Sequence, residues 1–159
     1  MAISFDINDI LKVAVKIEEN GETFYHYAEG ITKNKDTKKL FKFLADEEAN
    51  HKKTFEDMLS KIDKSESLEG YPEEYLTYLR TYVDKVIFTK KAKKTDFSAV
   101  KDTLSAINFA IQRELDSILY YQEMKRLVHK SQESIIERII DEERRHFLKL
   151  QEIKKQGRA

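Results

Sequence analysis

Residues 46–51 read DEEANH and residues 141–146 read DEERRH, so one short pattern occurs twice in this chain. In a helix, a Glu and a His three positions apart lie on the same face, where both can reach one metal ion. Both copies contain such a pair at the same place: Glu48 with His51, and Glu143 with His146. The repeat predicts two equivalent helices that each present a carboxylate and an imidazole.

A second repeated pattern precedes each of these segments. Residues 14–25 read AVKIEENGETFY and residues 110–121 read AIQRELDSILYY, which align at an offset of 96 residues. The aligned copies share an Ala, a Glu and a final Tyr, so that Glu18 matches Glu114 and Tyr25 matches Tyr121. The chain therefore looks like a duplicated helix hairpin in which each half contributes equivalent side chains.

Apolar residues recur every three or four positions through four long segments, which is the period of amphipathic helices. We expect these helices at about 6–30, 36–62, 102–128 and 131–155. Asp6 can cap the start of the first helix and Gly30 can end it. Short links join the helices of each pair, which makes the two members antiparallel neighbours.

The expected organisation is a single domain over 1–159, with helix pairs at 6–62 and 102–156 and a crossover at 63–101. The crossover should hold a shorter helix at about 72–88, since proline is well tolerated in a first turn. Residues 90–94 read KKAKK and are expected to be a solvated loop, with a docking patch for an acidic electron donor as the alternative. Two helix pairs with one long crossover predict an all-α, ferritin-like four-helix bundle.

Six ionisable side chains fall on the apolar faces of these helices and so point at one core. An unpaired buried carboxylate costs several kcal/mol or becomes protonated, and four of them would repel one another. Two divalent cations would balance the four carboxylates, with the imidazoles as neutral donors. Carboxylate and imidazole ligands without thiolate suit iron or manganese, with zinc as an alternative. The predicted metal ligands are Glu18, Glu48, His51, Glu114, Glu143 and His146.

Composition excludes several other kinds of site. The 159 residues include no cysteine, which rules out disulfides, thiolate zinc sites, iron–sulfur clusters and a cysteine nucleophile. The 29 basic and 29 acidic residues cancel, which argues against nucleic acid as the main partner. The N-terminus lacks a signal-peptide pattern, and no apolar run approaches the roughly 20 residues of a membrane helix. We therefore expect a soluble cytoplasmic protein with no membrane partner.

The sequence resembles the rubrerythrin and ferritin-like di-iron family, because two Glu-x-x-His pairs alternate in order with two Glu-x6-Tyr segments. The resemblance covers all four long helices. It implies two iron ions held by the six residues, and reduction of hydrogen peroxide or activation of oxygen with electrons from a separate redox protein. It also implies a homodimer. The alternatives are ferritin-like iron oxidation and storage in a cage of many subunits, and a non-enzymatic bundle that presents a surface to a partner.

Two features depart from the family pattern. Rubrerythrins usually carry a rubredoxin domain with four cysteines, and this chain has no cysteine, which is why a separate electron donor is implied. Rubrerythrins also have an extra carboxylate one turn after the third-helix Glu, where this chain has Ser117. The second departure concerns the peroxidase activity and leaves the six predicted ligands intact.

Two alternative roles are expected for each of four side chains near the predicted ligands. Tyr25 and Tyr121 are expected either to hydrogen-bond ligand carboxylates, a supporting catalytic role, or to pack as ordinary core residues. Glu47 and Glu142 are expected at the surface, with the alternative that each steadies an imidazole across the bundle. The remaining histidines have no Glu three residues earlier and are expected to be exposed or structural: His26 and His129.

Overall fold

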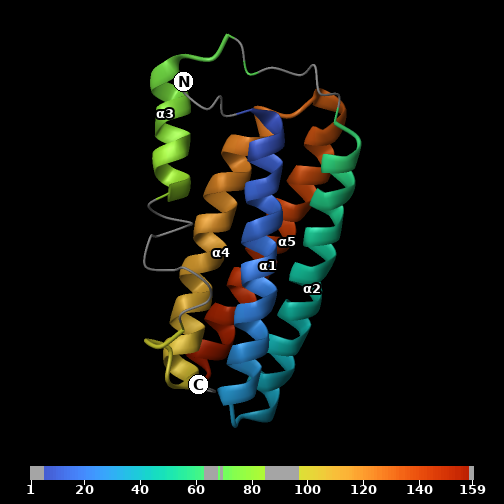
Figure 1. Cartoon of the computed structure of the whole chain (residues 1–159). Coiled ribbons are helices and arrows are strands. Elements are labelled where there is room, and N and C mark those ends of the chain that lie inside the picture. The colour runs from blue at the N-terminus through green and yellow to red at the C-terminus, as the bar shows by residue number, and fades with distance from the viewer. Residues whose placement is uncertain (1–5, 63–67, 69, 85–96, 158–159) are drawn as a thin grey trace.

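The computed structural model describes residues 6–62, 68, 70–84 and 97–157. Four long helices pack side by side as a bundle, and a short fifth helix lies beside one end of it (Figure 1). This arrangement confirms the predicted all-α, ferritin-like fold class. The helices are α1 (Ile7–Ile31), α2 (Lys35–Ser60), α3 (Glu73–Tyr82), α4 (Thr103–Lys125) and α5 (Glu133–Lys155).

Helix starts are fixed by side chains that accept the free backbone N–H groups of a first turn. The Asp6 carboxylate accepts from the Asp9 N–H, and the Asp9 carboxylate accepts from the Asp6 N–H, each at 3.0 Å. This reciprocal capping box begins α1 at the predicted place. Asp102 and Ser105 form the same arrangement at the start of α4, and Asn34 caps α2.

The predicted stop at Gly30 is wrong, because α1 continues through this residue to Ile31. Gly30 has helical backbone geometry, whereas positive φ angles occur at Gly70 and Gly157 among the described glycines. Thr32 is the C-terminal cap of α1, and its backbone turns to an extended conformation with φ −90° and ψ 130°. Its hydroxyl donates to the Ala28 carbonyl at 2.6 Å, which satisfies one acceptor of the last turn.

The connections also differ in detail from the sequence prediction. Helix α4 ends at Lys125, and a 3₁₀ turn, η2 (Lys130–Gln132), precedes α5. His129 begins that turn by accepting the Ser131 N–H at its ring nitrogen. Helix α3 follows Pro72 and ends at Tyr82, so the expected extension to 88 falls partly outside the described residues. Residues 90–94 lie outside them entirely.

The apolar core divides into two clusters, one toward each end of the bundle. Each fully buried Ile, Leu or Phe side chain contributes about 1.5–3 kcal/mol relative to an exposed one. The two clusters hold the four helices together above and below a polar middle layer. The first cluster includes Ile10, Leu11, Phe55, Met124 and Ile136, and the second includes Phe24, Phe41, Leu44, Ala110 and Leu150.

None of the helices in the described part of the chain combines the length and the apolar character needed to cross a membrane.

Candidate metal centre

The structure brings all six predicted ligand residues into the middle layer of the bundle. Every one of them is buried, with at most 3% of its surface exposed. Helices α1 and α4 supply one Glu each, and α2 and α5 supply one Glu-x-x-His pair each, as the repeat predicts. The residues are Glu18 from α1, Glu48 and His51 from α2, Glu114 from α4, and Glu143 and His146 from α5.

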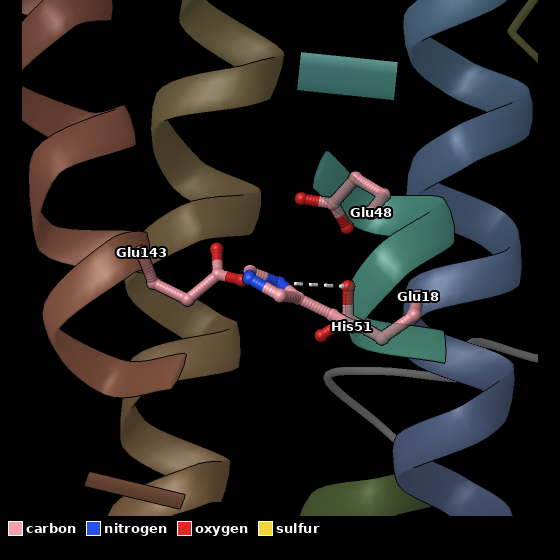
Figure 2. Close-up of side chains that lie close together, drawn as sticks. All are labelled: Glu18, Glu48, His51 and Glu143. Carbon is pink, nitrogen blue, oxygen red and sulfur yellow. Dashed lines mark ion pairs between the residues drawn. The ribbon is translucent and has the colours of Figure 1, made fainter. Parts of the chain in front are cut away.

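These side chains form two overlapping groups that could each hold a metal ion. In each group, ligand atoms from four residues lie within 4.8 Å of one another. Figure 2 shows the first group, in which the His51 ring lies between the carboxylates of Glu18 and Glu143. The groups are Glu18, Glu48, His51 and Glu143, and Glu48, Glu114, Glu143 and His146.

Two carboxylates belong to both groups. Glu48 and Glu143 contribute to each group, whereas Glu18 and Glu114 contribute to one group each. A carboxylate has two oxygens and can therefore contact two neighbouring ions. This geometry favours Glu48 and Glu143 as bridging groups and Glu18 and Glu114 as terminal ones.

Several ligand atoms at the centre are buried and have no hydrogen-bond partner. His51 Nδ1 lies 2.8 Å from Glu143 Oε1 and 3.6 Å from Glu18 Oε2. His146 Nδ1 lies 3.6 Å from Glu143 Oε2 and 3.8 Å from Glu114 Oε2. Buried polar atoms nearly always have a hydrogen-bond partner, so a cluster of buried carboxylate oxygens and imidazole nitrogens that face one another without one suits positive ions. The unpartnered atoms are Glu18 Oε2, His51 Nδ1, Glu114 Oε2, Glu143 Oε1 and His146 Nδ1.

Burial and mutual repulsion change the acidity of the carboxylates in the metal-free cluster. Burial raises the pKa of Glu48 well above its usual value, and the charges of Glu18, Glu143 and Glu114 raise it further. Burial and the Glu143 charge likewise raise the pKa of Glu114 to about 8. Glu143 differs, because its close polar contacts with Glu114 and with both imidazoles outweigh burial and hold its pKa well below the usual range. The metal-free cluster therefore retains protons near neutral pH.

The two imidazoles also hold protons in the metal-free protein. Burial alone would lower the pKa of His51, but the Glu143 and Glu18 carboxylates outweigh burial and raise it to about 12. The Glu114 and Glu143 carboxylates similarly overcome burial at His146 and raise its pKa to about 10. Metal ions would have to displace these protons, since metals bind the neutral imidazole.

Tyr25 and Tyr121 hydrogen-bond the carboxylates of Glu114 and Glu18 across the bundle. The Tyr25 hydroxyl on α1 donates to Glu114 on α4, and the Tyr121 hydroxyl on α4 donates to Glu18 on α1. Burial, followed by the charge of the bonded carboxylate, raises the pKa of each phenol well above its usual value. Both phenols therefore keep their protons and orient the carboxylates, while the second oxygen of each carboxylate lacks a hydrogen-bond partner.

The expectation that Glu47 and Glu142 are plain surface residues is wrong for Glu142. Its Oε2 lies 2.7 Å from His51 Nε2 on the opposite helix pair, and Glu47 Oε2 lies 3.8 Å from His146 Nε2. An outer carboxylate on the distal nitrogen is typical of histidines that bind metals. The sequence feature that could have predicted this contact is that a Glu directly precedes the predicted ligand Glu in both copies of the repeat, Glu47 before Glu48 and Glu142 before Glu143. The other two histidines are exposed, as expected.

Sequence reasoning missed the pair formed by Arg113 and Gly21. Arg113 Nη2 lies 4.0 Å from Glu48 Oε2 and donates to the Ile17 carbonyl at 3.2 Å. Gly21 provides the space, because a Cβ there would overlap the Glu48 carboxylate and lie 2.5 Å from Arg113 Nη2. The sequence feature that could have revealed this pair is a mismatch between the two copies of the repeat. Gly21 in the first copy aligns with Ser117 in the second, which is also buried.

Comparisons with known proteins agree with this geometry. A family model described as Rubrerythrin matches residues 9–154 of the chain. Among solved structures, one from Thermotoga maritima, described as a ferritin-like di-iron carboxylate protein, is similar with a TM-score of 0.69 and 29% identity. The similarity covers 99% of each chain. No match was found among curated proteins.

Proposed function

Because the chain belongs to the rubrerythrin family, we propose that it is a non-haem di-iron oxidoreductase that reduces hydrogen peroxide with electrons from a separate redox protein. The observation that carries the proposal is the pair of overlapping ligand groups that share Glu48 and Glu143. Two ions bound in this way lie next to each other, which is the arrangement that a two-electron reaction on a small molecule needs. The carboxylate and imidazole donor set supports iron, with manganese and zinc as alternatives.

The two groups of four side chains suggest which residues would bind which ion. Glu18 and His51 would bind one ion, and Glu114 and His146 would bind the other, while Glu48 and Glu143 would bridge both. The facing unpartnered atoms of five of these residues support this assignment, because each gains a partner when ions are present. The near-symmetry of the helix repeat supports it further, since each half of the chain would supply equivalent ligands.

Reduction of hydrogen peroxide to two molecules of water takes two electrons and two protons, and two bound ferrous ions would supply the electrons. The protein side chains set the geometry for this reaction. Tyr25 and Tyr121 would hold the terminal carboxylates in place through their hydroxyls. Glu142 would hold the His51 ring through its distal nitrogen, which leaves Nδ1 directed at the centre. The bundle core on either side excludes bulk water from the cluster.

Metal content and peroxide consumption test the proposal together. Protein loaded anaerobically with ferrous iron should hold about two irons per chain, as two-metal sites do. The reduced protein should consume peroxide faster than the same concentration of free ferrous ion. A Glu48→Ala, Glu143→Ala variant should lose the iron and the activity together. Failure of the wild-type protein to bind iron, or to consume peroxide faster than free ferrous ion, would exclude this function.

We also take the protein to be a homodimer, and one face of α4 supports this. Leu104, Leu115 and Leu119 are 11 and 4 residues apart, which places them on one side of that helix, and they are 48%, 42% and 46% exposed. Exposed apolar side chains that gather on one face are typical of a protein–protein contact. Oligomeric state separates the proposed activity from the alternative of iron storage, which would require a closed cage of many subunits.

A further inference from the structure

The near-symmetry of the centre breaks at the rings beside the two ligand-bonding tyrosines. Tyr121 packs against Phe55 and Tyr120, with ring centroids 5.1 and 6.0 Å apart. Tyr25 packs likewise against Phe41 at 6.0 Å, but its other neighbour is Phe24, at 5.4 Å. Phe24 and Tyr120 occupy the same position of the sequence repeat, one residue before the matched tyrosines. A second tyrosine therefore directly precedes the ligand-bonding one in only one half of the repeat.

Four tyrosines follow one another along one side of α3: Tyr71 precedes the helix, and Tyr75, Tyr78 and Tyr82 lie within it. They are spaced four, three and four residues apart, and neighbouring ring centroids lie 5.8, 6.3 and 6.3 Å from each other. The planes of neighbouring rings are within 30° of parallel. These rings form a continuous stack along the helix, which we call the tyrosine ladder: Tyr71, Tyr75, Tyr78 and Tyr82.

The ladder is attached to α4 on both sides of Tyr120. The Tyr82 hydroxyl donates to the Asp116 carbonyl at 2.8 Å, and the Tyr75 hydroxyl donates to the Glu123 carboxylate at 2.6 Å. Asp116, Tyr120 and Glu123 are four and three residues apart, so they share one face of α4. Tyr120 therefore lies between the two points at which the ladder is fixed to this helix.

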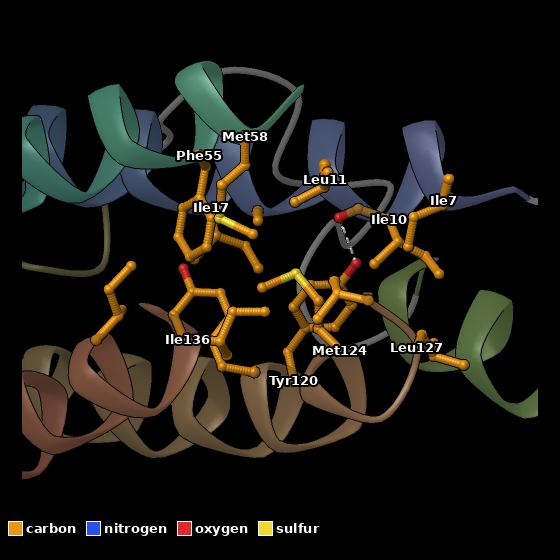
Figure 3. Close-up of a cluster of buried hydrophobic side chains, with 14 of the residues drawn as sticks. Ile7, Ile10, Leu11, Ile17, Phe55, Met58, Tyr120, Met124, Leu127 and Ile136 are labelled. Atoms are coloured by element: carbon orange, nitrogen blue, oxygen red, sulfur yellow. Dashed lines mark hydrogen bonds between the residues drawn. The ribbon is translucent and has the colours of Figure 1, made fainter. Parts of the chain in front are cut away.

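Tyr120 itself is buried in the core cluster against which Tyr75 and Tyr82 pack. Figure 3 shows its ring inside this cluster, with its hydroxyl donating to the Ile10 carbonyl on α1. Burial chiefly raises the pKa of Tyr120, and the charge of Asp9 and the hydroxyls of Tyr75 and Tyr82 raise it further. A row of tyrosines therefore runs from Glu18 to Tyr78, which is 45% exposed. Ring contacts join Tyr121 to Tyr120 and the ladder tyrosines to one another, and shared packing in this cluster joins Tyr120 to Tyr75 and Tyr82.

The chemistry of these side chains suits movement of single electrons. The chain has no tryptophan and no cysteine, so tyrosine is its most readily oxidised aromatic side chain, and phenylalanine is not oxidised under comparable conditions. A tyrosine that loses an electron must also lose its hydroxyl proton, which requires a nearby base. Tyr75 has a carboxylate for this purpose, because its hydroxyl donates to Glu123 at 2.6 Å.

We propose that Tyr121, Tyr120 and the tyrosine ladder form a one-electron path between the metal centre and the protein surface at Tyr78. The proposal rests on the di-iron function proposed above. In this path Tyr75 would give one electron through the rings of Tyr120 and Tyr121 to the centre, when the centre holds oxidised iron, and would give its hydroxyl proton to Glu123.

A one-electron reductant outside the protein completes the sequence. It reduces the Tyr75 radical through the exposed ring of Tyr78, and Glu123 returns the proton to Tyr75. One electron has then moved from the external reductant to the centre, and every proton is back on its starting oxygen. The path gives the separate electron donor a place to act, since the ligands themselves are at most 3% exposed.

Radical trapping tests this path with two variants and a matched control. The iron-loaded protein is mixed with hydrogen peroxide and the trap 2-methyl-2-nitrosopropane, and peptide mass spectrometry locates the adducts. Tyr120→Phe introduces phenylalanine, the residue that the other half of the repeat has at the matching position, Phe24. Glu123→Gln removes the carboxylate that accepts the Tyr75 proton, on a side chain that is 21% exposed. The control is Tyr27→Phe, because Tyr27 contacts Phe97 and lies outside the row.

We expect wild-type adducts at Tyr75 or Tyr78, and a fall of at least an order of magnitude in both variants. The Tyr27→Phe control should match the wild type. Adducts on α3 that persist in Tyr120→Phe, or adducts that form at Tyr25 instead, would overturn the path while the proposed function stands. Iron content and peroxide consumption are measured in the same samples. A wild-type protein that binds iron but consumes no peroxide would reject the proposed function and the path with it.

Discussion

Gly21 shows how an absent side chain can shape the centre. Its position lets the Glu48 carboxylate and the Arg113 guanidinium approach α1, where a Cβ would overlap the carboxylate. We expect Gly21→Ala to displace Glu48 and to weaken metal binding about 10- to 100-fold, the usual effect of disturbing groups that support metal ligands. Chelator competition on the reconstituted protein measures this change.

Gly30 offers a matched control for that substitution. It is also helical, but a Cβ at Gly30 would meet nothing within 4 Å. Gly30→Ala should therefore leave metal affinity unchanged and stabilise the fold by roughly 0.5–1 kcal/mol, because alanine loses less conformational entropy in a helix. Equal metal affinities in the two variants would show that the space at Gly21 has no bearing on the centre.

The titrating groups of the cluster predict opposite effects of pH on the metal-free and metal-bound proteins. Folding raises the pKa of Glu114 to about 8 and those of His146 and His51 to about 10 and about 12. A group with a raised pKa binds more protons in the folded state, so the free energy of unfolding falls as pH rises toward that value. The metal-free protein should therefore become less stable as pH rises from about 5 to about 9.

Metal binding reverses this dependence, because the ions displace the same protons. Metal affinity should rise over that pH range, and the loaded protein should gain stability relative to the metal-free form. Calorimetric unfolding of both forms across pH measures the difference between them. Parallel curves for the two forms would mean that these protons are not coupled to metal binding.

At the scale of the helices, the sequence predicted which faces are buried more reliably than where each helix ends. Faces follow from the spacing of apolar residues along a whole segment, so Glu18 and Glu114 could be placed in the core from the pattern alone. Ends depend on single contacts, such as the Thr32 hydroxyl on the Ala28 carbonyl, which no periodicity reveals. Gly30 was misread for that reason.

Asn34 provides a test of such a single contact. Its side-chain oxygen accepts the Asp36 and Thr37 N–H groups at 3.0 and 3.1 Å and so begins α2. Asn34→Ala should lower the free energy of unfolding by about 1 kcal/mol, while Asn34→Asp should retain the cap. Urea unfolding measures both variants. Equal losses in the two would contradict the capping role.

At the scale of the whole molecule, the duplicated hairpin explains what could be read from sequence and what could not. Residues that repeat in both halves, such as Tyr25 and Tyr121, could be placed together by matching the copies. Residues that break the repeat could not, and Arg113 contacts Glu48 only because Gly21 on another helix leaves room. Contacts of this kind depend on three helices at once, which a one-dimensional pattern does not encode.

The exposed apolar face of α4 leads to a prediction about assembly. Lysine at both Leu115 and Leu119 would place two charges in a dimer contact, where burying unpaired charge is costly. We expect the wild type to have twice the mass of one chain by light scattering after size exclusion, and the double variant to have the mass of one. Leu148→Lys on α5 is the control, because Leu148 lies on another helix and, at 63%, is the most exposed large apolar side chain of the described residues. A wild-type monomer would contradict the dimer, and a particle of many subunits would favour iron storage over peroxide reduction.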